Sequence, residues 1–259
     1  MARRVRLLGR LAGLLPVYVF LYLPLAVLVA LSFNASRFMT SWQGFTFKWY
    51  AKLAANPMLV AAAWHSVLVA VLAATLATVL GTMTAYALYR YRFSGRALMR
   101  AGLGVVMLQP DIVMGVSLLM LFILLGMTPG FLTLLLAHVT FCLPFAAVTV
   151  GARLKALDPN LIEAAKDLGA GEYRAFRHVI LPNAVAAVAA GWLLSFTLSM
   201  DDVIISFFVT GPQFEILPLR IYSMVRMGVK PDVNALSAIM IGVTAILVLA
   251  SQFLLRRRK

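Results

Sequence analysis

Long stretches without charge constrain the fold of this 259-residue chain more than any other feature. Five of them exceed twenty residues: 11–36, 53–89, 112–152, 178–200 and 233–255. A helix that crosses the hydrocarbon core of a bilayer needs about 20 apolar residues. The chain is also 63% hydrophobic and 12% charged, whereas soluble domains are roughly 45–50% apolar. These stretches therefore predict an all-α, polytopic membrane protein.

Two of the stretches are too long for one helix. The stretch 112–152 must turn, and MTPG at 127–130 is a typical turn sequence. The stretch 53–89 begins with a segment around Asn56 and Pro57 that we assign to a loop or interface. We therefore expect six transmembrane helices in one domain, near residues 11–33, 62–89, 101–126, 131–152, 183–209 and 233–255.

Basic residues are distributed unequally among the loops between these helices. The net charge is +14, from 23 Lys and Arg against nine Asp and Glu. Seventeen of the basic residues lie before span 1, after span 6, or in the loops that follow spans 2 and 4, and six lie in the other loops. Basic residues accumulate on the cytoplasmic side of membrane proteins. The pattern predicts cytoplasmic termini, and it explains the charge without nucleic-acid binding.

The residue groupings that common catalytic and metal sites need are missing. His65, His138 and His178 have no paired ligand spacing, and Cys142 is the single cysteine. There is no Walker-type glycine loop and no nucleophile elbow. A membrane enzyme is therefore the weaker interpretation, and neither a cofactor nor a metal is expected in this chain. His138, in mid-span, is expected to hydrogen-bond a neighbouring helix.

Segment 153–182, between the fourth and fifth spans, carries charge and strong helix signals. Asp158–Pro159 is a typical helix start, and Gly169 fits the left-handed position that ends a helix. We expect one short helix over 159–168 and a second near 172–179. The apolar face of the first helix is predicted to comprise Leu161, Ala164, Ala165 and Leu168.

The same segment carries a recognisable pattern. Glu163-Ala164-Ala165 is followed after three residues by Gly169, and after nine more by Val179-Ile180-Leu181-Pro182. This pattern resembles the EAA signature of permease subunits of bacterial ABC importers, with Val179 in the place of an isoleucine. In that family the segment is a coupling helix that seats in a separate ATPase subunit. The resemblance implies an ATPase-coupling site made of Glu163, Ala164, Ala165, Leu168 and Gly169.

Further stretches extend the resemblance from about residue 32 to the end of the chain. WQGFTFKWY (42–50), HVTFCLPF (138–145) and SFTLSMDDVIISFFVTGP (195–212) are similar to permease subunits of spermidine/putrescine importers. The resemblance implies a single permease domain over 1–259, with a peripheral first span at about 11–33 and core spans over about 62–255. It places the chain in the bacterial inner membrane.

The resemblance also implies partners. They are a second homologous permease, a dimer of ATPase subunits that bind ATP and Mg, and an extracytoplasmic polyamine-binding protein, which the outer segment 211–232 is expected to face. Two other functions stay open. One is import of a different small solute by the same architecture. The other is a stand-alone secondary transporter, which inverted repeats would favour, although none is evident.

Three acidic residues, Asp111, Asp201 and Asp202, fall within predicted spans. A charge at a helix centre costs roughly 2.5–3.5 kcal/mol on insertion scales, so such residues usually face a water-filled path or a partner. Asp111 follows Pro110, which can break a helix, so it is either a cap for the next half-helix or part of a path.

Asp201 and Asp202 point about 100° apart if the helix is continuous. Asp202 then shares its face with a stripe of serines, and Asp201 shares its face with Phe208. The stripe favours either helix packing or a carboxylate site for a cationic cargo, with Phe207, Phe208 or Tyr222 adding cation–π contact. The sequence does not decide which aspartate faces the path.

Overall fold

The computed structural model describes residues 2–37, 41–228 and 230–256, with side chains described for 14–37, 41–228 and 230–246. Within these ranges the chain is helical, and its strand-like pairing is limited to one isolated bridge between Asn34 and Phe45. The all-α class is therefore confirmed for the described residues. The helices are α1 (Ala2–Ser32), α2 (Lys48–Ala54), α3 (Pro57–Arg90), α4 (Arg96–Leu108), α5 (Asp111–Leu124), α6 (Phe131–Lys155), α7 (Leu161–Asp167), α8 (Glu172–Ala175), α9 (Leu181–Asp201), α10 (Ile204–Val209), α11 (Leu217–Arg226) and α12 (Pro231–Arg256).

Several of these helices are long and apolar enough to cross a membrane. In the described part of the chain four qualify alone: Leu14–Ser32, Pro57–Arg90, Phe131–Lys155 and Glu172–Asp201. A fifth span arises if α4 and α5 are counted together, and Pro231–Ile246 is a shorter apolar helix. The structure thus supports four to five spans. Six spans and cytoplasmic termini stay predictions.

The chain divides into two compact units. Unit 1 comprises the residues up to Val60 and those from Arg220 onward, and unit 2 comprises Ala61–Leu219. In unit 1, α1 and α2 both pack against α12. An ion pair from Lys52 Nζ to Asp232 Oδ2 (2.7 Å) joins α2 to the start of α12. The predicted single domain over 1–259 stays a prediction.

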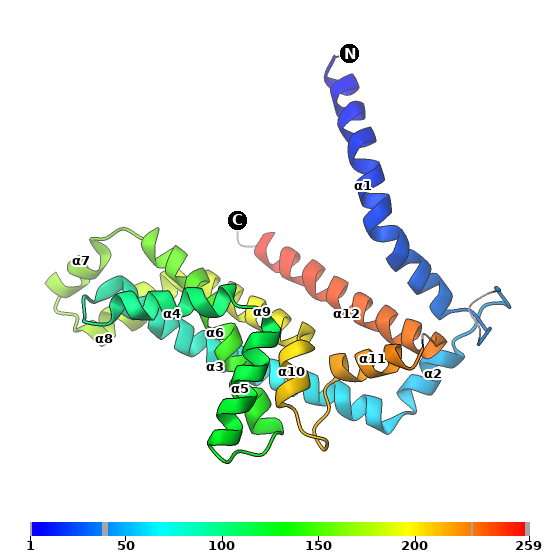
Figure 1. Ribbon diagram of the computed structural model, residues 1–259. Coiled ribbons are helices and arrows are strands. Elements are labelled where there is room, and N and C mark those ends of the chain that lie inside the picture. The colour runs from blue at the N-terminus through cyan, green and yellow to red at the C-terminus, as the bar shows by residue number, and fades with distance from the viewer. Residues whose placement is uncertain (1, 38–40, 229, 257–259) are drawn as a thin grey trace. The chain divides into compact units, whose positions relative to one another are not determined.

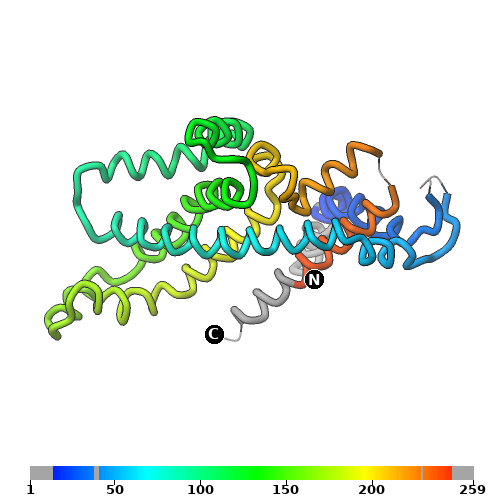
Figure 2. The backbone as a smooth tube through the Cα atoms, turned by 90° about the horizontal axis from the view of Figure 1, so that it is seen from below, coloured from blue at the N-terminus to red at the C-terminus, as the bar shows by residue number. Residues whose placement is uncertain are grey.

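Unit 2 is held together by small residues at helix contacts. The face of α3 that points inward contains Ala70, Ala73, Ala74 and Ala77, all fully buried. At Gly81 an added Cβ would lie 2.9 Å from the Ala147 backbone nitrogen, and at Gly191 it would lie 3.5 Å from Ala146 Cα. Side chains this small let the backbones of α3 and α9 approach α6 closely. Figures 1 and 2 show α3 turning back into α4, with α7 and α8 at one end of the unit.

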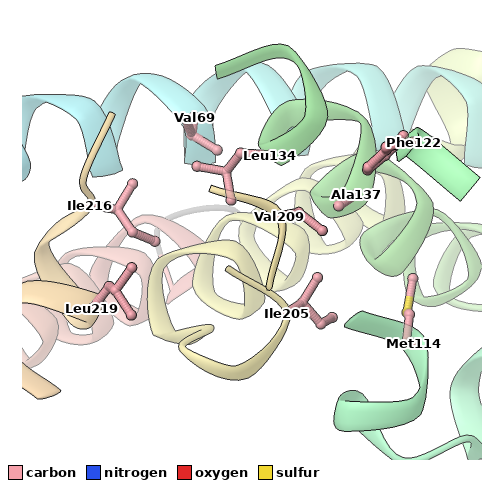
Figure 3. Packing of buried hydrophobic residues seen from close by; sticks show 9 residues of the cluster. All are labelled: Val69, Met114, Phe122, Leu134, Ala137, Ile205, Val209, Ile216 and Leu219. Carbon is pink, nitrogen blue, oxygen red and sulfur yellow. The ribbon is translucent and has the colours of Figure 1, made fainter. Parts of the chain in front are cut away.

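A hydrophobic cluster surrounds the short helix α10. Its side chains come from α3, α5, α6, α10 and the start of α11, and they converge in Figure 3. Buried members include Val69, Met114, Leu134, Ile205 and Ile216. The cluster anchors the short helix α10, which is too short to be stable alone.

Two predicted spans are interrupted helices. The span expected at 101–126 consists of α4 and α5, bent by 115° where Gln109 and Pro110 adopt extended conformations. The span expected at 183–209 consists of α9 and α10, interrupted by the extended backbone of Asp202 (φ −68°, ψ 126°). The break that Pro110 suggested is therefore present, whereas the continuous helix expected through Asp201 and Asp202 was wrong. Pro110 accounts for the first break, because it lacks an N–H and cannot follow a helical residue comfortably.

The remaining boundaries lie within five residues of the sequence-based ones, except that α1 begins at Ala2, nine residues before the expected start of the first span. The predicted loop at Asn56 is confirmed, because its side-chain Oδ1 accepts hydrogen bonds from the backbone N–H groups of Met58 and Leu59. We expected Pro57 to lie in the same loop, but it is the first residue of α3. Proline is well suited to this position because the first helical N–H has no partner inside the helix.

The close contact at Gly81 generates a stability prediction. In Gly81→Ala the new methyl group meets the backbone of α6, so the α3–α6 contact must open, which costs about 1–3 kcal/mol. Gly102→Ala in α4 is the matched control, because nothing lies within 4 Å of its added Cβ. Thermal unfolding of the purified protein in detergent is the measurement. A Gly81 variant as stable as the Gly102 variant would show that α3 and α6 are not in tight contact.

Candidate functional site

Asp202 occupies the interruption between α9 and α10 and satisfies the backbone there. Its carboxylate accepts hydrogen bonds from the N–H groups of Ile205 (3.2 Å) and Ser206 (2.8 Å), and from the Ser206 hydroxyl (2.7 Å). The first N–H groups of a helix have no partner inside it, and a carboxylate at this position is a strong cap. Only 8% of Asp202 is exposed. The local sequence therefore ends one helix and starts another around a single side chain.

His138 of α6 connects the two sides of this interruption. Its Nδ1 is hydrogen-bonded to the Ser199 hydroxyl on α9 (2.7 Å), and its Nε2 to the Ser206 hydroxyl on α10 (2.9 Å). The same Nε2 lies 3.4 Å from Asp202 Oδ2. His138 is fully buried. The expectation that His138 bonds a neighbouring helix is confirmed, and we call these four residues the His138 network.

Asp201 and Asp202 have different environments. Asp202 is buried in the His138 network, whereas Asp201, the last residue of α9, is exposed. Ser195, Ser199 and Ser206 are buried on the same side as Asp202. The packing interpretation therefore describes the serine stripe and Asp202, although the stripe does not lie on one continuous helix. Of this pair, Asp201 is the carboxylate that is exposed.

The other predicted path residues belong to different elements. Asp111 is exposed at the first position of α5, so it begins the second half-helix after the break. Phe208 is half-buried and packs against the hydrophobic cluster, and an added Cβ on Gly115 of α5 would lie 2.7 Å from its ring. Phe207 is the more exposed ring, at 54%. Tyr222 belongs to unit 1, where its ring lies 5.5 Å from the Arg226 guanidinium.

Segment 153–182 contains a short helix with a well-formed end. Helix α7 begins at Leu161, two residues later than expected, because Asp158 instead closes a turn by accepting the Asn160 N–H (2.9 Å). Gly169 has φ +82°, its N–H bonds the Lys166 carbonyl, and the next N–H bonds the Ala165 carbonyl. This pair of bonds is a Schellman motif. The predicted left-handed glycine is confirmed.

The face of α7 divides differently from the prediction. Ile162 and Ala165 are buried inside unit 2, while Leu168 is 90% exposed and Ala164 and Glu163 are also exposed. The four residues predicted as one apolar face are therefore divided between a buried side and an exposed side of the helix. Leu168 with Ala164 forms an outward apolar surface at the end of the unit seen in Figure 1.

The second short helix expected at 172–179 is the beginning of a longer one. Helix α8 continues through a π-helical turn, Phe176–Ile180, into α9. In this turn the Leu181 N–H bonds the Phe176 carbonyl, five residues back. Pro182 explains the turn, because proline has no N–H and its ring displaces the carbonyl four residues earlier. The helix therefore runs on as Glu172–Asp201.

Glu172 ties this long helix to its surroundings. Its Oε1 accepts hydrogen bonds from Arg90 at the end of α3 (3.1 Å) and from Lys166 of α7 (2.5 Å). Glu172 thus joins three elements, the end of α3, α7 and the start of α8. Sequence reasoning did not single out this residue. Its signal was its position after Gly171, where acidic residues favour a helix start.

Comparison with known proteins assigns a family to this architecture. The family described as "Binding-protein-dependent transport system inner membrane component" matches residues 77–258. The chain belongs to this family. The protein is therefore an inner-membrane permease, and its helices α3 to α12 carry most of the family match.

Individual relatives cover almost the whole permease. It is 57% identical over 240 residues to the spermidine/putrescine transport system permease protein PotC of Escherichia coli (strain K12), covering 93% of this chain and 91% of that protein. It is 54% identical over 248 residues to PotC of Haemophilus influenzae, covering 96% of each. The putrescine transport system permease protein PotI of Escherichia coli (strain K12) is 40% identical over 260 residues, covering 98% of this chain and 92% of that protein.

Solved structures agree on the fold. The bacterial ABC transporter involved in the import of alginate has a TM-score of 0.78 at 15% identity, covering 99% of the permease and 96% of that chain. The MetNI methionine ABC transporter has a TM-score of 0.68 at 18% identity, covering 79% of the permease and 99% of that chain. The helix arrangement is thus shared with ABC importers whose named cargoes differ.

The different environments of the two aspartates generate a prediction. In Asp202→Ala the N–H groups at the start of α10 and the His138 ring lose an acceptor, so the free energy of unfolding should fall by about 2 kcal/mol. Asp201→Ala is the matched control and should change stability little, because Asp201 is exposed. Thermal unfolding of the purified permease compares them. Equal stability of the two variants would contradict the capping role.

Proposed function

We propose that this permease is the transmembrane subunit of an ATP-driven importer of polyamines, and that it forms the translocation path with a second, homologous permease. The observation that carries the proposal is the identity of 57% to PotC across nearly the full length of both proteins. The likeness to PotI supports the same class of cargo. Six spans with both termini in the cytoplasm fit the distribution of basic residues along the chain.

The chemistry of the carboxylates supports a cationic cargo. Asp201 and Asp111 are exposed at helix ends within an otherwise apolar part of the chain. Asp111 lies four residues before Gly115 of α5, and Asp201 lies four residues before Ile205 of α10. Gly115 packs against Ile205, so the two carboxylates precede the same helix contact. Predicted spans contain no Lys or Arg that could neutralise these carboxylates. An ammonium group of the cargo would do so, and Phe207 on α10 has an exposed aromatic ring that suits cation–π contact.

The exposed surface of α7 supports an ATPase partner. Ala164 and Leu168 offer a small apolar surface, and Glu163 adds a charge beside it. Small side chains permit close seating, and a charge at the rim fixes orientation. ATP and Mg belong to the ATPase dimer in this proposal, and this chain catalyses no reaction. An extracytoplasmic binding protein would deliver the cargo to the outer segment 211–232.

Transport by Asp201 variants tests the cargo assignment. Asp201→Asn keeps the shape and removes the charge, so spermidine uptake by the whole importer should fall about tenfold or more, since a bond to a charged group is lost. The variant should still assemble and hydrolyse ATP. Uptake of radiolabelled spermidine into vesicles containing the importer is the measurement, with a neutral solute as competitor. Normal spermidine uptake would contradict a cargo contact, and competition by the neutral solute would favour a different cargo.

The exposed leucine of α7 tests the ATPase contact. In Leu168→Asp a charge replaces an apolar side chain at the proposed interface, so co-purification of the ATPase subunit should be lost while the permease remains folded. Leu98→Asp at the start of α4 is the control, because Leu98 is 78% exposed but lies outside segment 153–182. Retention of the ATPase by the Leu168 variant would show that this surface is not the contact.

A further inference from the structure

An apolar groove with no assigned role runs along unit 2. It has a cavity volume of about 820 Å³ and lies between α3 and the helix formed by α8 and α9. Its lining is almost entirely apolar, with Val79 and Met83 on one side and Phe176 and Val188 on the other. Val79 is 53% exposed and Met83 is 61% exposed, so the groove opens outward from a helix that crosses the membrane.

Basic residues lie next to one end of the groove, in contact with residues that line it. Glu172 and Tyr173 line it at the end of α3 where Arg90 lies. Arg90 and Lys166 both contact the Glu172 carboxylate, and Arg177 donates a hydrogen bond to the Tyr173 hydroxyl (3.1 Å). Two cations therefore meet one carboxylate at this end, and a third, Arg177, contacts the neighbouring tyrosine. The excess of positive charge disfavours a polyamine and favours a phosphate group.

The length of the groove matches one leaflet of a bilayer. Val79 and Arg90 are separated by eleven residues of α3, which is about 16 Å at the rise of an α-helix. One leaflet contributes about half of a hydrocarbon core that is roughly 30 Å thick. An acyl chain in the groove would thus reach mid-membrane from a headgroup held at the basic end. The predicted topology places that end on the cytoplasmic side, where anionic lipids are attracted to basic residues.

We propose that the groove binds one anionic phospholipid, with its acyl chain between α3 and α9 and its phosphate at Arg90, Lys166 and Arg177. The lipid would contact the place where α3, α7 and α8 are joined through Glu172. Binding does not depend on the identity of the transported cargo. It therefore goes beyond the proposed function and can be tested separately from it.

Native mass spectrometry of the complete importer in detergent tests the proposal. With added phosphatidylglycerol, one lipid should be retained by the wild-type protein, and phosphatidylcholine should be retained less. Met83→Trp fills the groove and should abolish the retention, whereas Leu76→Trp, on an exposed part of α3 outside the groove, should not. Arg177→Gln should weaken phosphatidylglycerol binding about fivefold and leave phosphatidylcholine binding unchanged.

Two results would overturn the proposal. One is equal retention of phosphatidylglycerol by the Met83 variant, the Leu76 variant and the wild type. The other comes from cross-linking, which is selective because Cys142, the single native cysteine, is buried. A cysteine introduced at Val79 should react with a lipid-soluble thiol reagent in the assembled importer. If it instead cross-links to the second permease, a protein helix and not a lipid fills the groove.

Discussion

The structure of unit 2 depends on how a helix can be interrupted inside apolar surroundings. An open helix end leaves unpaired N–H and C=O groups, and each costs several kcal/mol where no water can reach it. Asp202 supplies acceptors for the start of α10, and His138 connects the hydroxyls of Ser199 and Ser206 across the gap. An aspartate within a membrane span is usually assigned to a ligand path. Here the Asp202 carboxylate is hydrogen-bonded within the chain at a helix start, and its neighbour Asp201 is exposed.

Features with local causes could be predicted from the sequence, and features with tertiary causes could not. The left-handed Gly169 and the apolar stretches depend on nearest neighbours and composition, so both were predictable. The interruption at Asp202 has no Pro or Gly to mark it, and it is stabilised from α6 by a histidine 64 positions away. The serine stripe therefore correctly grouped Asp202 with buried serines, but it did so by assuming a continuous helix that the structure does not have.

The same distinction explains the candidate sites. On α7 the spacing of apolar residues identified an amphipathic helix, but two apolar positions on adjacent turns, Ala165 and Leu168, ended on opposite sides of the boundary with solvent. Amphipathic spacing does not distinguish a surface that packs inside the chain from one left for a partner. Phe208 was selected as an aromatic contact for cargo, yet the absence of a side chain at Gly115 allows α5 to cover its ring.

One continuous helix links the two candidate sites. From Glu172 to Asp201 the chain runs for 30 residues, about 45 Å at the rise of an α-helix, with the π-helical turn near its start. Glu172 fixes one end to α7 through Lys166, and the other end stops at the His138 network. Between these two ends α9 packs closely against α6, because the absent side chain at Gly191 lets its backbone approach Ala146, where an added Cβ would lie 3.5 Å from the Cα. The interruption after Asp201 is bridged by the same network, because His138 bonds Ser199 of α9 and Ser206 of α10, while α5 and the hydrophobic cluster hold α10 from its other sides.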